Sequence, residues 1–158
     1  MRQLPLIWSL AICATGATLA PPATAESPQA PAHYYDWTVD DYEIKQPLGG
    51  LTGDPARGRA IAGDQYRGNC LACHALPIPE EEYFGNLGPP LTGIGARQSV
   101  SMIRLHVVDQ SFFNPETVMP GYYRRPEKLN RVAPELKGRT WLTAQEIEDV
   151  VAYLATLK

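Results

Sequence analysis

Two cysteines and a histidine stand at the spacing that attaches a haem group covalently. Cys70 and Cys73 are separated by two residues, and His74 follows directly, which gives the pattern C-x-x-C-H. Two thiols at this spacing can each add to a vinyl group of one porphyrin, and the adjacent imidazole can bind the iron as an axial ligand. The pattern therefore predicts one covalently bound haem c whose iron is ligated by His74.

The same cysteines allow two other interpretations. Because the third cysteine of the chain, Cys13, lies close to the N-terminus, Cys70 and Cys73 could form a small disulfide loop with each other. They could also be a thioredoxin-like redox pair, although no β-α-β pattern surrounds them. The histidine favours the haem, because chance produces C-x-x-C-H in such a chain with a frequency on the order of one in a thousand.

Beyond residue 25, four residues could bind the iron on the side opposite His74, namely Met102, Met119, His33 and His106. Met102 and His106 are four residues apart on an expected helix, a spacing more typical of core packing, and His33 lies in a proline-rich stretch. Met119 lies in an expected loop, and the proline after it restricts the backbone. We therefore predict His74/Met119 ligation. This ligand pair raises the reduction potential and fills both axial positions, which indicates electron transfer rather than substrate activation at the iron.

The residues after the haem motif suggest supporting contacts. A stretch rich in proline, residues 77–91, could supply a backbone carbonyl to the second ring nitrogen of His74 and so fix the orientation of the imidazole. Arg97 follows this stretch. Its guanidinium could pair with a haem propionate, although a solvated surface arginine is an equally good interpretation.

Two stretches have helical patterns that flank this region. The first runs from about 54 to 63 and leads into the haem motif, with Asp54 as the N-cap and a proline in the first helical position. Gly58 and Ala62 lie on one face of it, where small side chains would let another helix cross closely. The second runs over 99–109, with a serine as its N-cap.

The clearest helix is expected near the C-terminus. Thr143 and Glu146 form a capping box. An apolar stripe follows at helical spacing, made of Ile147, Val150, Val151, Leu154 and Leu157. Glu148 and Asp149 are expected on the other face, near the helix N-terminus where the dipole favours acids. Since no alternating strand pattern appears, the sequence predicts an all-α fold of three to four helices and long loops around the haem.

Composition and the N-terminus add limits. The 158 residues carry a formal net charge of −3, which argues against nucleic acid as a partner. Residues 1–25 have the basic start, apolar run and A-x-A site of a signal peptide cleaved after Ala25, and the run is too interrupted to favour a retained membrane span. A lipid anchor on Cys13 is disfavoured, because Ile12 stands where a small residue is needed. We therefore predict a periplasmic protein with an extended arm at 26–53 and one domain at 54–158.

The order of the motifs resembles that of the class I cytochromes c. These proteins share a helix, C-x-x-C-H, Gly-Pro-x-Leu, a Met-Pro loop and a C-terminal amphipathic helix, and residues 88–97 of this chain match the segment that follows the haem motif. The resemblance implies that Pro89 supplies the carbonyl bound by His74. It also implies that Arg97 contacts a haem propionate.

A narrower resemblance is to the SoxX family, carried by residues 68–74, 114–124 and 142–154, with P-E-T-V-M-P as the most specific stretch. It implies that this chain is the monohaem subunit of a heterodimer. The other subunit would be a SoxA-like cytochrome with one or two haems. Such a complex is an L-cysteine S-thiosulfotransferase, in which SoxA joins thiosulfate to a cysteine of the carrier SoxYZ. This chain would be the non-catalytic subunit that takes the electrons and passes them to a small cytochrome c.

Two other functions remain open from the sequence. A freely diffusing electron-carrier cytochrome would have the same haem site without a permanent partner. A peroxidase-like haem protein would have an open or labile position opposite His74. The absence of any cysteine after Cys73 means that the chain cannot itself supply a cysteine-derived ligand to a haem iron, which favours an electron-accepting role.

Overall fold

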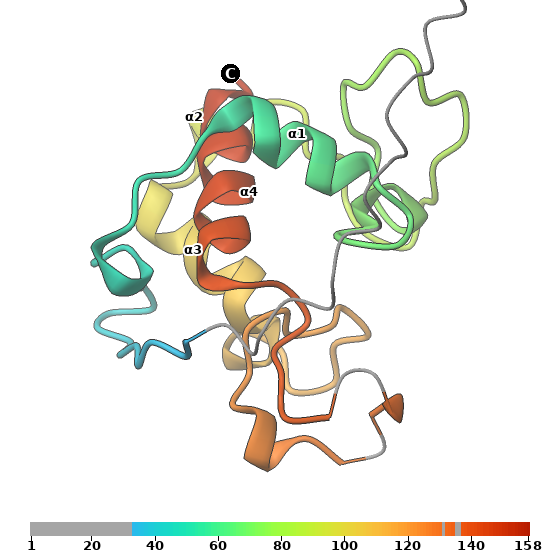
Figure 1. Ribbon diagram of the computed structural model, residues 1–158. Coiled ribbons are helices and arrows are strands. Elements are labelled where there is room, and N and C mark those ends of the chain that lie inside the picture. The colour runs from blue at the N-terminus through green and yellow to red at the C-terminus, as the bar shows by residue number, and fades with distance from the viewer. Residues whose placement is uncertain (1–32, 131, 135–136) are drawn as a thin grey trace, which may run out of the picture.

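A computed structural model describes residues 33–130, 132–134 and 137–158. Within these ranges the chain forms four α-helices and four short 3-10 turns and contains no strand (Figure 1). The helices are α1 (Pro55–Gly63), α2 (Ile94–Arg97), α3 (Val100–Asp109) and α4 (Ala144–Thr156), and the turns are η1 (Leu48–Gly50), η2 (Cys70–Ala72), η3 (Gln110–Phe112) and η4 (Pro126–Lys128). The predicted all-α class is confirmed. The predicted signal peptide at 1–25 lies outside the described residues, and no helix among those described is long and apolar enough to cross a membrane.

The three expected helices begin at the residues whose side chains cap them. Asp54 accepts hydrogen bonds from the first turn of α1, and Ser99 accepts one from Met102 N in α3. At the start of α4, Thr143 and Glu146 make both hydrogen bonds of the capping box. Each cap satisfies backbone N–H groups that have no partner inside the helix. Local sequence therefore sets where these helices start.

The helix before the haem motif crosses the C-terminal helix at close range. Figure 1 shows α1 lying across α4, and these two helices share the most extensive helix contact in the described chain. A Cβ atom on Gly58 would lie 1.9 Å from the carbonyl oxygen of Asp149, and Ala62 is fully buried. The small residues on this face of α1 are therefore what allows the two backbones to meet, as the sequence predicted.

Glu148 and Asp149, expected on the face of α4 other than the apolar stripe, are buried. Their exposed fractions are only 3% and 1%. Glu148 pairs with Arg104 of α3 at 2.9 Å, and Asp149 accepts from Arg57 of α1 at 2.9 Å and 3.0 Å. Because α1 and α3 cover α4 from different sides, little of its circumference is left to water. The acids can be buried because each meets an arginine.

The described part of the expected arm, residues 33–53, packs on the helices. Leu48 is buried and its N–H donates to Glu148 at 2.9 Å, while the carbonyl of Ile44 accepts from Arg104 at 2.8 Å. Further back, the ring of Tyr34 stacks on Tyr123 with the centroids 4.8 Å apart. The aromatic residues at the start of this segment therefore pack on their own domain.

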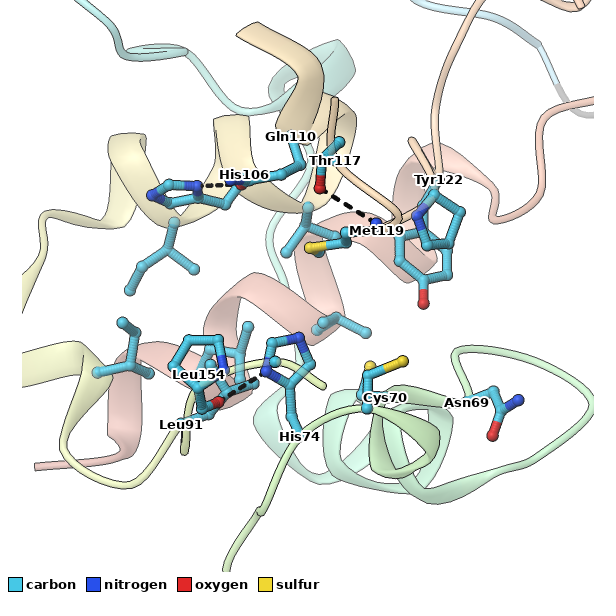
Figure 2. A pocket seen from close by; sticks show the side chains of 18 of the residues that line it. Asn69, Cys70, His74, Leu91, His106, Gln110, Thr117, Met119, Tyr122 and Leu154 are labelled. Carbon is cyan, nitrogen blue, oxygen red and sulfur yellow. Dashed lines mark hydrogen bonds between the residues drawn. The ribbon is translucent and has the colours of Figure 1, made fainter. Parts of the chain in front are cut away.

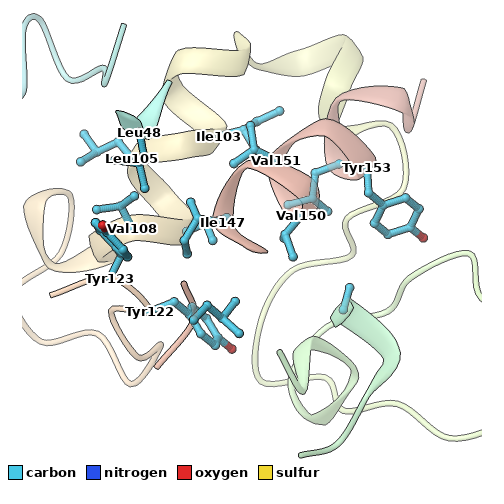
Figure 3. Packing of buried hydrophobic residues seen from close by; sticks show 14 of the residues in the cluster. Leu48, Ile103, Leu105, Val108, Tyr122, Tyr123, Ile147, Val150, Val151 and Tyr153 are labelled. Atoms are coloured by element: carbon cyan, nitrogen blue, oxygen red, sulfur yellow. The ribbon is translucent and has the colours of Figure 1, made fainter. Parts of the chain in front are cut away.

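The hydrophobic core joins α3, α4 and the chain that follows the Met119 loop (Figure 3). Tyr122 and Tyr123 are buried, and their N–H groups donate to the carbonyls of Val107 and Val108 at 3.3 Å and 3.2 Å. These bonds fix the end of the loop to α3. Backbone hydrogen bonds and buried aromatic rings, beginning three residues further along the chain, therefore fix the position of Met119.

The α1–α4 crossing gives a stability prediction. Replacing Gly58 by Ala should lower the free energy of unfolding by about 1–3 kcal/mol or more, because the new methyl group overlaps the backbone of α4. Thermal or urea unfolding measures this. Gly63→Ala is the matched control on the same helix, since its Cβ would meet only Ile78 at 3.6 Å. Equal effects of the two substitutions would show that the close crossing is not what requires glycine.

Candidate haem site

The C-x-x-C-H residues lie on a tight turn directly after α1. Asn69 takes a left-handed conformation with φ of 49° and precedes η2. Within the turn, the N–H of His74 donates to the carbonyl of Cys70 at 2.9 Å. Cys70 and Cys73 are both free thiols in this structure. The turn therefore gathers both thiols and the imidazole of the motif within one compact unit.

These three side chains face a cavity of about 290 Å³ between two walls of the domain (Figure 2). In this view Cys70 and His74 rise from one wall, and Met119 and His106 come from the opposite wall. The lining is mainly apolar, with contributions from every α-helix except α1. Its aliphatic members are Leu87, Leu91, Ile94, Ile103, Val107, Val118, Leu142, Val150 and Leu154. Such a lining suits a large, flat, hydrophobic cofactor.

The imidazole of His74 is held by the loop that follows it. Its Nδ1 donates to the carbonyl oxygen of Pro89 at 2.7 Å, which is the contact that the resemblance implied. A Cβ atom on Gly88 would lie 2.3 Å from the ring, so glycine is needed for the loop to pass this closely. The bond to Pro89 leaves the Nε2 atom as the nitrogen available to a metal.

Met119 lies on the wall that faces His74, as Figure 2 shows. Its N–H donates to the hydroxyl of Thr117 at 3.1 Å, a contact within the loop that the sequence analysis did not use. On the far side of Met119, the bonds of Tyr122 and Tyr123 to α3 fix the loop. The backbone that carries the Met119 side chain is therefore held by hydrogen bonds both before and after this residue.

The other ligand candidates are placed differently. Met102 is not among the residues that line the cavity. His33 packs edge-on against Tyr35 with ring centroids 4.7 Å apart, in the N-terminal segment. His106 does line the cavity, on the same wall as Met119. Of the four candidates, the structure thus brings Met119 and His106 to the site.

Arg97 does not reach the cavity. It is exposed, and its guanidinium donates to the carbonyl of Thr92 at 2.7 Å and to that of Pro90 at 3.4 Å. These bonds stabilise the loop that carries Pro89. A contact between Arg97 and a haem propionate stays a prediction.

The protonation of the thiols argues against a redox pair. Burial raises the pKa of Cys70 to about 11, and burial also raises the pKa of the neighbouring Tyr122, whose hydroxyl donates to the carbonyl of Gly68 at 2.6 Å. A thioredoxin-like pair needs a thiolate stabilised by nearby positive charge. Cys70 lies instead among apolar groups, where the neutral thiol is favoured.

The donor set and the cavity fit a c-type haem. The two thiols lie at one end of an apolar slot, the imidazole on one wall has its second nitrogen bound, and a thioether stands on the opposite wall. No group of three or more His, Cys, Asp or Glu residues in the described chain could hold a bare metal ion. Cys70, Cys73 and His74, with Met119 opposite, are thus the residues that would hold the haem and its iron.

Comparison with known proteins identifies the family. The cytochrome c family model matches residues 55–158. The chain is also similar to a solved structure described as SoxXA from P. pantotrophus, at 32% identity and a TM-score of 0.70, over 77% of this chain and 94% of that one. No curated protein sequence matches the chain. The chain therefore belongs to the cytochrome c family and is SoxX-like within it.

The contact between Gly88 and the His74 ring gives a prediction about assembly. In Gly88→Ala the methyl group should push the imidazole off the Pro89 carbonyl and lower the yield of protein with correctly ligated haem. Haem staining per amount of protein, together with the visible spectrum, measures this. Gly63→Ala serves again as control because it adds the same methyl group without a clash. A normal spectrum and yield in Gly88→Ala would contradict the proposed closeness of loop and ligand.

Proposed function

We propose that this member of the cytochrome c family is the electron-transfer haem subunit of a periplasmic SoxAX-type complex. The observation that carries the proposal is that His74 and Met119 stand on opposite walls of one apolar cavity, with Cys70 and Cys73 at its end. A haem held there would supply one-electron transfer, with His74 and Met119 as the residues that would bind its iron. A closed site of this kind favours electron transfer over binding of oxygen or peroxide.

Each residue of the site then has a defined role. Cys70 and Cys73 would hold the porphyrin covalently, and His74 and Met119 would ligate the iron. The Pro89 carbonyl, bound to His74 Nδ1, orients the imidazole and increases its basicity. The thioether of Met119 favours the reduced iron and so raises the reduction potential. The aliphatic lining excludes water from the cavity.

The assignment to a SoxAX-type complex rests on the likeness to SoxXA. In that assignment a SoxA-like cytochrome with one or two haems is the heterodimer partner and joins thiosulfate to a cysteine of a SoxYZ-like carrier. This chain has no cysteine after Cys73, so the cysteine-derived ligand that the resemblance implies for the catalytic haem would come from the partner. Electrons would leave this subunit to a small cytochrome c.

The role of Met119 can be tested by substitution. Met119→Ala should remove the thioether ligand, change the visible spectrum and lower the reduction potential by a sizeable part of the range of about 0.8 V that axial ligands span. Met102→Ala is the matched control, since Met102 does not line the cavity. If Met119→Ala kept the wild-type spectrum and potential, Met119 would not be the ligand. If the purified wild-type protein carried no covalent haem, the whole proposal would fail.

Co-purification and reduction assays test the complex. Expressed together with a SoxA-like cytochrome from the same cells, the chain should elute as a stable heterodimer, and its haem should become reduced when thiosulfate and a SoxYZ-like carrier are added. Omission of the carrier is the control. A lone monomer that exchanges electrons equally well with unrelated cytochromes would instead support the freely diffusing carrier.

A further inference from the structure

The imidazole of His106 is a polar group of the cavity lining that the roles above leave unused, as are the amides of Asn69 and Gln98. This residue lies on α3 and lines the cavity from the Met119 wall. Its Nδ1 is bound to the side-chain oxygen of Gln110 at 2.5 Å, and its ring stacks on Phe113 with the centroids 4.1 Å apart. Because an amide oxygen only accepts, Nδ1 carries a hydrogen and Nε2 is the nitrogen left for another partner.

The position of His106 relative to the cysteines decides which part of a haem it would meet. Figure 2 shows His106 at one end of the cavity and Cys70, with Tyr122, at the other. In haem c the two thioether bonds lie along one edge of the porphyrin, and the two carboxylates lie on the opposite edge. If Cys70 and Cys73 hold the first edge, the carboxylates are directed toward the end where His106 stands.

The other polar side chains that line the cavity on the side away from His74 are uncharged and would make weaker hydrogen bonds to a carboxylate than an imidazole that can carry positive charge. Arg97 is exposed and donates to loop carbonyls of Thr92 and Pro90. The hydroxyl of Thr117 accepts from Met119 N and keeps its own hydrogen to donate, whereas the Tyr122 hydroxyl donates to the carbonyl of Gly68. A haem carboxylate placed against an apolar lining needs a hydrogen-bond or ionic partner. His106 is a group that lines the cavity, is held in a fixed orientation and has a free nitrogen.

We propose that His106, positioned by Gln110 and Phe113, binds a haem carboxylate through Nε2 in place of the expected Arg97. This inference rests on the proposed haem attachment. Because the Nδ1 hydrogen is directed to Gln110, donation from Nε2 to the carboxylate requires a hydrogen on both nitrogens of the ring. Such a donor offsets part of the carboxylate charge, which otherwise opposes addition of an electron to the iron. His106 thus contributes to a high reduction potential without touching the metal.

The test uses the haem-loaded full chain with three variants. His106→Leu removes the donor at similar size, His106→Gln keeps an N–H donor, and Arg97→Leu removes the guanidinium. We expect His106→Leu to shift the propionate bending bands in the resonance Raman spectrum and to lower the reduction potential, with the low-spin His/Met spectrum unchanged. His106→Gln should restore part of both shifts, and Arg97→Leu should cause neither.

Other outcomes would overturn the inference. If Arg97→Leu moved the propionate bands and His106→Leu did not, the carboxylate partner would be Arg97. If His106→Leu converted the iron to a high-spin form, His106 would be an iron ligand and not a carboxylate partner. A wild-type protein without covalent haem would refute the proposed function itself, and that result is separate from either of these.

Discussion

Two adjacent buried carboxylates on α4 determine how the rest of the domain is arranged. Glu148 binds Arg104 of α3 and the backbone of Leu48, and Asp149 binds Arg57 and the N–H of Asp54 at the start of α1. A buried charge without its partner is strongly destabilising, so these contacts specify one register for each element. Because α1 leads to the cysteines and α3 supports the opposite wall, the same two residues set the width of the haem cavity.

The site combines residues from one short turn with a residue that lies far from them in the sequence. Cys70 and His74 are fixed within a single turn, whereas Met119 belongs to a loop that reaches the cavity only because Tyr122 and Tyr123 bind α3. The loop also contains Thr117, which accepts from Met119 N. A residue held from two sides in this way would rearrange little as the ligand of an iron that changes oxidation state, which suits the proposed electron transfer.

Features made by residues close together in the sequence could be predicted, whereas features made by residues far apart could not. The helix starts at Asp54, Ser99 and Thr143 were predictable, because a cap involves residues within one turn. The burial of Glu148 was not, since its partner Arg104 is 44 residues away and acids near a helix N-terminus usually face water. The place of Arg97 was likewise hidden, because the carbonyls that bind it become acceptors only once the proline-rich loop has folded.

The family resemblance assigned two roles to residues 88–97, namely support of His74 and contact with a haem propionate. In our proposal these roles are divided between Arg97 and His106. Arg97 binds the carbonyls of the loop that carries Pro89, so its charge supports the His74 side of the site from outside the cavity. His106 stands inside, on the Met119 side, and Gln110, which directly follows α3, lies four residues after it, a spacing that would have marked the pair in the sequence. The pair lines a cavity that is otherwise mainly apolar, which places an imidazole nitrogen where a haem carboxylate would meet it.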